Sequence, residues 1–199
     1  MVQLFRGIEE IPVLAREGAI VPLKNMEVFD NDTDNPKSLE IKIFPGKTGS
    51  FTLWEDEGDC VEESWVETKL EKAQEEGKDC FIIHSPQGNT AVLPEKRCWK
   101  LDFVKIKENI VSVLVDGKET VYKATVEKNG MCIEITEVPV NAEIKVVFEN
   151  PIEESLADIA QEAYAILEKA QISYNLKSDL YEIIKEQQKG AIATLASME

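Results

Sequence analysis

The sequence predicts a mainly β protein, an antiparallel β-sandwich followed by a small C-terminal helical segment. Between residues 39 and 149, short runs of alternating apolar and polar residues recur, separated by turn residues. Asp116-Gly117 and Asn129-Gly130 separate such runs, and these dipeptides favour type I′ hairpins. After Asn150-Pro151 the apolar spacing changes to that of a helix. Many short strands with regular turns are typical of a sandwich or barrel.

The first 24 residues form a separate segment in this prediction. The run from Ile11 to Leu23 is mostly apolar and is broken at Arg16-Glu17-Gly18. This pattern predicts two short buried strands around a glycine turn. Because a lone hairpin is at best marginally stable, we expect it to need a partner sheet.

Residues 25–38 are polar and predict a loop. Asp30, Asp32 and Asp34 alternate as at the start of a calcium-binding loop. Asn35 stands where that loop needs glycine, and Ile41 stands where it needs a bidentate glutamate. A solvated loop is therefore favoured, and no metal site is predicted.

Strands are expected through the middle of the chain. Leu39, Ile41 and Ile43 share one face, and Phe51 and Leu53 face opposite to Thr52 and Trp54. The segment 67–79 is charged and poor in apolar residues, which favours a long hairpin loop or an exposed edge strand. Further strands are expected at 81–84, 111–115, 120–126, 131–136 and 144–148.

Helices are expected after residue 150. Asn150 can cap a first helix over 152–170, with Pro151 as its first residue. A second helix is predicted over 176–189, ending at Gly190, and a short third one over 191–197. The chain is thus divided into residues 1–24, 25–150 and 151–199.

The charge of the chain excludes some classes of partner. Its 199 residues hold 22 basic and 38 acidic side chains, so the net charge is −16. Such a chain repels nucleic-acid phosphates and anionic lipid, so we expect neither partner. No membrane-spanning run or signal peptide is visible at the N-terminus, and we expect a cytoplasmic protein.

The residues that carry metal or redox chemistry are sparse. The four cysteines (Cys60, Cys80, Cys98 and Cys132) form no CxxC pair, and His84 is the one histidine. A Cys/His zinc site would need ligands from distant segments, so we expect reduced thiols and no cofactor. His84 has neither a nucleophile elbow nor a second histidine, which favours a structural role.

No catalytic residue is predicted. Glu55, Asp56, Glu57 and Asp59 cluster in a turn that includes a glycine, where acids are usually solvated and ionised. Acid–base catalysis by a pair of carboxyls instead needs an environment that raises the pKa of one of them, such as an apolar pocket.

Three tryptophans are candidate carbohydrate-binding residues: Trp54, Trp65 and Trp99. Sugar faces stack on exposed aromatic rings. Tryptophan in a small sandwich is also often half-buried packing. Both readings stay open.

Two segments resemble glycoside hydrolase family 31, the α-glucosidase and α-xylosidase family. In that family two β-sandwich domains, proximal and distal, follow the catalytic barrel. Residues 11–22 resemble the end of the proximal domain, with its pattern like IPVFVRAGAIIPL. Residues 51–58 resemble the distal F-x-L-Y-E-D-D-G turn, with Trp54 for the tyrosine and Glu57 for the second aspartate.

The resemblance implies a non-catalytic C-terminal accessory domain of an α-glucosidase-like hydrolase. Residues 1–24 would be remnant strands of the proximal domain and residues 25–150 the distal sandwich. The barrel, of about 250 residues, does not fit here, and nothing matches the nucleophile motif like W-x-D-M-N. The chain alone is therefore expected to be inactive, with the barrel and proximal domain as partners. Two alternatives remain: a carbohydrate-binding module, or an interaction module that forms a homo-oligomer through the exposed hairpin or the helical tail.

Overall fold

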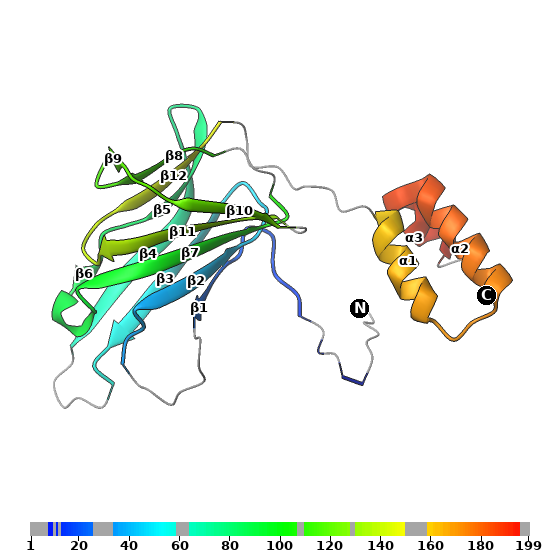
Figure 1. Ribbon diagram of the computed structural model, residues 1–199, viewed down its shortest axis with the longest axis horizontal. Helices are drawn as coiled ribbons and strands as arrows, with labels where there is room; N and C mark the ends of the chain where they lie inside the picture. The colour runs from blue at the N-terminus through cyan, green and yellow to red at the C-terminus, as the bar shows by residue number, and fades with distance from the viewer. Residues whose placement is uncertain are drawn as a thin grey trace. The chain divides into compact units, whose positions relative to one another are not determined.

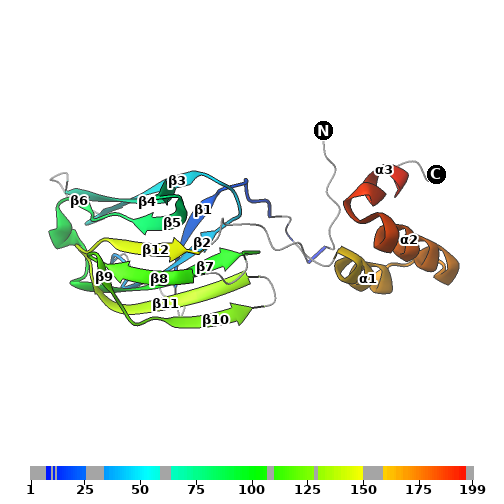
Figure 2. The ribbon, with the colours of Figure 1, turned by 90° about the horizontal axis from the view of Figure 1, so that it is seen from above.

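The computed structural model describes residues 8–9, 11, 13–25, 34–58, 64–106, 110–127, 130–149 and 159–195. The chain divides into two compact units, Met1–Glu154 and Ser155–Glu199. The first is built of strands in two sheets that face one another, and the second is built of helices (Figures 1 and 2). The mainly β fold with C-terminal helices that the sequence predicts is confirmed.

The first sheet has the order β1-β2-β7-β11-β10. Strands β2 and β7 run parallel, and the other neighbours are antiparallel. Its strands are β1 (Ile20–Lys24), β2 (Ser38–Ile43), β7 (Lys96–Val104), β10 (Lys123–Glu127) and β11 (Gly130–Pro139).

The second sheet has the order β3-β4-β5-β12-β8-β9, and β6 pairs with β4 beside this path. All of its described pairings are antiparallel. Its strands are β3 (Gly49–Asp56), β4 (Trp65–Glu75), β5 (Lys78–Ile83), β6 (Gln87–Gly88), β8 (Ile110–Val115), β9 (Lys118–Glu119) and β12 (Ile144–Phe148). A short 3-10 turn, η1 (Thr90–Val92), precedes β7.

The core lies between the two sheets. Successive side chains of a strand point to opposite faces, so alternate apolar residues meet in the middle. In β2 these are Leu39, Ile41 and Ile43, all buried as predicted. The Phe103 ring forms T-shaped pairs with the rings of Phe81 and Phe148, at centroid distances of 6.0 and 5.3 Å.

The hairpin predicted for residues 11–23 does not form. Residues 13–16 are outside any strand, and β1 begins at Ile20 and pairs with β2. Ile11 is 85% exposed, so the buried strand expected there is wrong. Periodicity alone showed an apolar run but could not show which strand would supply its hydrogen-bond partners.

Segment 67–79 is also different from its prediction as a loop or edge strand. Strand β4 lies in the interior of the second sheet, between β3 and β5. Its inward positions hold Val66, Thr68, Leu70 and Lys72, all buried. The polar character of two of these inward side chains concealed the strand pattern.

The Asp116-Gly117 turn is confirmed. Both residues have positive φ, 49° and 74°, as a type I′ turn requires. It joins β8 to β9, and the strand expected over 120–126 forms only from Lys123 onward, as β10. Strand β9 stays in the second sheet, and β10 joins the first. Asn129 of the second predicted turn lies outside the described residues.

The helical unit contains α1 (Ile159–Lys169), α2 (Tyr174–Gln187), η2 (Gln188–Gly190) and α3 (Ala191–Leu195). Ser173 caps α2 by accepting a hydrogen bond from the Leu176 backbone N–H. The predicted cap at Asn150 lies outside the described residues. The chain leaves α2 at Gln188, which has a φ of 51°, two residues before the predicted stop at Gly190. None of the described helices is both long enough and apolar enough to cross a membrane.

Candidate functional site

Strand β3 carries the segment Phe51-Thr-Leu-Trp-Glu-Asp56 and sets the direction of each of its side chains. Because the strand alternates, Trp54 points away from the core and Glu55 points into it. Glu55 is 8% exposed, whereas Trp54 is 60% exposed. The two halves of this motif therefore lie on opposite faces of the sheet.

Glu55 forms a buried, bidentate ion pair with Arg97 of β7. The guanidinium Nη1 and Nη2 donate to the two carboxylate oxygens at 3.0 and 2.8 Å. Arg97 Nε donates to the carbonyl oxygen of Pro36 at 2.9 Å, and its guanidinium carbon lies 5.6 Å from the Trp99 ring centroid. This pair joins the two sheets, because β3 and β7 belong to different ones.

The ion pair corrects the expectation that the acids of this turn are all solvated. Glu55 has both carboxylate oxygens hydrogen-bonded to Arg97, so it is a structural anchor of the sandwich. Asp56 is exposed, and its Oδ1 accepts a hydrogen bond from the Gly58 backbone N–H at 2.8 Å. Asp59 lies outside the described residues. The sequence signal that could have indicated this ion pair is Arg97, the one arginine in β7, at an inward position of the strand.

The three tryptophans separate into two environments. Trp54 and Trp65, the latter 44% exposed, lie on the outer face of β3 and β4 with ring centroids 4.9 Å apart and planes tilted by 44°. Trp99 is 4% exposed and packs in the core. Because its ring faces are covered, Trp99 is removed from the predicted set of carbohydrate-binding residues.

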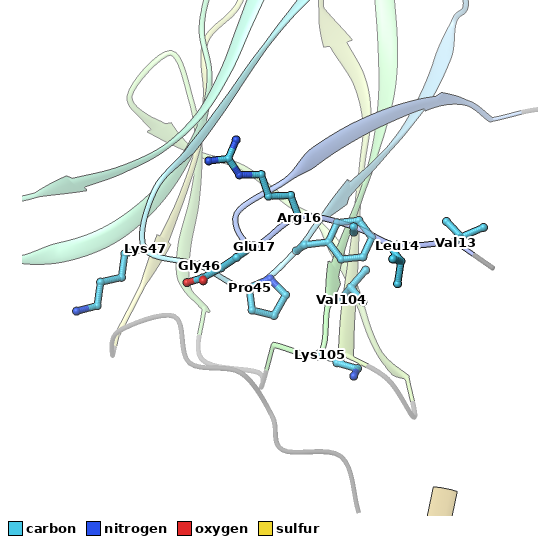
Figure 3. A pocket seen from close by; sticks show the side chains of 11 residues that line it. Val13, Leu14, Arg16, Glu17, Pro45, Gly46, Lys47, Val104 and Lys105 are labelled. Atoms are coloured by element: carbon cyan, nitrogen blue, oxygen red, sulfur yellow. The ribbon is translucent and has the colours of Figure 1, made fainter. Parts of the chain in front are cut away.

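A hollow of about 590 Å³ lies where the N-terminal segment crosses the loop between β2 and β3 (Figure 3). Gly18 N donates to the Pro45 carbonyl oxygen at 2.6 Å, and Phe44 N donates to the Ala19 carbonyl oxygen at 2.9 Å. The lining is apolar with three bases and one acid: Val13, Leu14, Ala15, Arg16, Glu17, Phe44, Pro45, Gly46, Lys47, Val104 and Lys105. The hollow lies beside exposed apolar side chains of the segment that leads into the sandwich.

Comparison with known proteins identifies solved structures that share the fold of this chain. No family model and no curated protein matches the chain. Two solved structures of a GH31 dextranase from Flavobacterium johnsoniae do match, a mutant complexed with isomaltotriose and the enzyme complexed with glucose. Each has a TM-score of 0.50 and 18% identity. The chain has the fold of a part of a family 31 glycoside hydrolase.

The match spans only part of each chain. It covers 66% of this chain and 19% of the dextranase chain. The chain therefore corresponds to about a fifth of the length of the family 31 structures. The resemblance to family 31 that the two sequence motifs predict is confirmed as a likeness of fold.

A buried lysine contacts the backbone of two residues that line the hollow. Lys72 of β4 is 6% exposed, and its ammonium donates to the carbonyl oxygens of Phe44 and Gly46. Burial lowers the pKa of Lys72 from its ordinary 10.5 to about 8, although the carboxylate of Glu17 acts in the opposite direction. This lysine ties the loop between β2 and β3 to β4.

We expect Lys72 to make the stability of the sandwich rise with pH. Between pH 8 and 10.5 the native state releases this proton before the unfolded state does, so the free energy of unfolding rises by about 2–3 kcal/mol. Urea unfolding at pH 7 and pH 10 measures the rise. Lys72→Met is expected to remove it, whereas Lys69→Met, at an exposed position of the same strand, leaves it in place. Equal pH dependence in the parent and Lys72→Met would contradict this assignment.

His84 and the described cysteines, the other residues considered for chemistry, have the surroundings of structural residues. His84 Nε2 lies 2.6 Å from Glu71 Oε1, and its Nδ1 lies 3.6 Å from Glu143 Oε2. Of the described cysteines, Cys80, Cys98 and Cys132, none is in a disulfide. Burial raises the pKa of the Cys80 thiol. Within the described ranges, no three potential metal ligands gather.

Proposed function

We propose that this chain is a non-catalytic accessory β-sandwich of a family 31-type glycoside hydrolase, an enzyme that cleaves α-glycosidic bonds. The observation that carries the proposal is the apolar segment leading into the sandwich. Ile11, Val13 and Leu14 are 85%, 83% and 76% exposed. Contiguous exposed apolar side chains mark interaction surfaces, so this segment supports a partner domain.

The hollow beside this segment indicates what the partner surface must offer. Its rim carries Arg16, Lys47 and Lys105 against the single acid Glu17, in a chain whose net charge is −16. A complementary partner would present apolar side chains to Val13 and Leu14 and acidic groups to the bases. The partners we propose are the catalytic barrel and the proximal β-domain of such an enzyme.

A lack of catalysis by this chain alone is supported by its chemistry. Glu55 is the buried acid of the segment 51–58. Both of its carboxylate oxygens accept hydrogen bonds from Arg97, so this carboxylate is not available as a general acid or base. We propose that the α-glucosidase-like activity belongs to the partner. A reducing, cytoplasmic location is also proposed, since the described cysteines hold no disulfide.

Complex formation tests the proposal. The full chain is mixed with a family 31 hydrolase of the same organism that lacks its own C-terminal sandwich, and mass is measured by sedimentation. A one-to-one complex is expected. Leu14→Asp is expected to weaken it at least about tenfold, because a buried unpaired charge costs more than about 1.4 kcal/mol. Val121→Asp, at a 92% exposed position elsewhere, is the matched control and should leave binding unchanged.

Activity of the isolated chain gives the second test. No release of p-nitrophenol from p-nitrophenyl α-glucoside is expected from the full chain. Release that a single carboxylate substitution abolishes would overturn the proposal. The proposal would also be overturned if no complex formed anywhere in a 100-fold dilution series that reaches protein concentrations of about 1 mM, the weak limit for transient partners.

A further inference from the structure

We propose that Trp54 and Trp65 form a platform on the outer face of β3 and β4 that binds the flat face of a neutral pyranose in an α-glucan. The choice of a sugar as ligand rests on the proposed function, since this sandwich would then lie in an enzyme that acts on α-glycosides. The site itself is argued from the geometry of these two strands.

The first observation is that the two rings form one contiguous surface. Asp56 of β3 pairs with Trp65 of β4, and Trp54 pairs with Glu67, so the two tryptophans lie diagonally across adjacent strands. Their centroids are 4.9 Å apart, and both residues keep a large exposed fraction. The C–H groups on one face of a pyranose contact such a surface, and the buried apolar area favours binding.

The second observation is that both rings stand on rigid backbone. Glu55, the neighbour of Trp54, is locked in the core by Arg97, which forces the Trp54 side chain outward. The Trp65 carbonyl oxygen accepts a hydrogen bond from Asn89 N at 3.0 Å. A surface held in place in the free protein loses little conformational entropy on binding.

The third observation is the polar surround of the rings. By strand alternation Thr52, Asp56, Glu67 and Lys69 share the outer face with the tryptophans. Hydroxyl and carboxylate groups beside an aromatic face are suited to the hydroxyl groups that project from the edge of a sugar ring. The acids also disfavour a nucleotide, whose phosphates they repel.

A quaternary ammonium ion is the competing ligand, because aromatic rings and acids also attract cations. On an open surface, however, each cation–π contact contributes only about 0.5–1 kcal/mol. Trp54 and Trp65 supply two rings on one sheet face, 60% and 44% exposed, so we commit to the sugar.

Binding is measured with the full chain by tryptophan fluorescence and calorimetry, using isomaltotriose and maltotriose. We expect a Kd of about 1 mM, corresponding to about −4 kcal/mol, and a fluorescence change that comes from the two exposed rings. Trp54→Ala and Trp65→Ala should each weaken binding at least about tenfold, while Trp54→Tyr, which keeps a ring, should retain most of it. Tyr174→Ala, at an 82% exposed aromatic of the helical unit, is the matched control and should bind as the parent does.

Three results would overturn the platform. They are no binding at sugar concentrations ten times the expected Kd, binding unchanged in the Trp54→Ala/Trp65→Ala double variant, and tighter binding of choline than of either sugar. The assay contains no barrel, and the complex assay contains no sugar. A chain that binds sugar but forms no complex would therefore count against the proposed function and leave the platform standing.

Discussion

Arg97→Met will destabilise the sandwich by about 3–5 kcal/mol, the cost of leaving a buried carboxylate without its partner. Arg97 has a fully buried side chain, and Glu55 is 5% exposed in its side chain. The substitution also removes the donor to the Pro36 carbonyl oxygen. Since domains of this size are stable by only about 5–15 kcal/mol, a large share of the folding free energy is lost.

The measurement is urea unfolding of four proteins: the parent, Glu55→Leu, Arg97→Met and the double variant. The double variant is expected to lose less than either single one, because two apolar side chains leave no unpaired charge in the core. Lys96→Met removes the exposed Lys96–Glu137 pair and should cost less than about 1 kcal/mol. Single variants that each cost less than 1 kcal/mol would show that the buried pair does not join the sheets as inferred.

Gly18→Ala is expected to cost about 3 kcal/mol or more, because the added carbon has no room. A Cβ at this position would lie 2.1 Å from the Thr48 carbonyl oxygen, and a Cβ at Gly49 would lie 2.0 Å from the Gly18 carbonyl oxygen. Both obstacles are backbone atoms, which cannot rotate away as a side chain can. The turn before β1 and the loop after β2 would have to separate, and the hollow between them would lose its shape.

Gly77→Ala is the matched control for this prediction. Gly18 and Gly77 have nearly the same φ, +76° and +80°, but a Cβ at Gly77 would meet nothing within 4 Å. The control should therefore cost only the 1–2 kcal/mol, roughly, of a left-handed backbone with a side chain. Thermal unfolding of both variants gives the difference, which isolates the steric term. Equal losses would mean that the two segments do not approach as closely as the geometry states.

Local sequence patterns correctly predicted the features of the fold that depend on residues close together in the chain. The Asp116-Gly117 dipeptide predicted its type I′ turn because both positions need positive φ, which these residues tolerate. The alternation in β2 predicted which face of that strand is buried. Helical spacing predicted helix α2 and the short helix α3 that follows it. The two family 31 motifs predicted the fold that the comparison with solved structures supports.

The candidate site needed contacts between residues distant in the chain. Glu55 and Arg97 are 42 residues apart, so the periodicity of either segment could not reveal their pairing. For the same reason, three tryptophans that look equivalent in sequence are divided by the fold into an exposed pair and a buried ring.

Alternation and turn chemistry act over a few residues, so the amino-acid order alone is enough to indicate strands, turns, helices and a sandwich. Which strands become neighbours depends on how two sheets share one core. That packing placed β4 in the interior, paired β1 with β2, and brought Trp54 beside Trp65. Burial of apolar surface stabilises the protein only when the core has assembled, so this contribution cannot be assigned to any single segment.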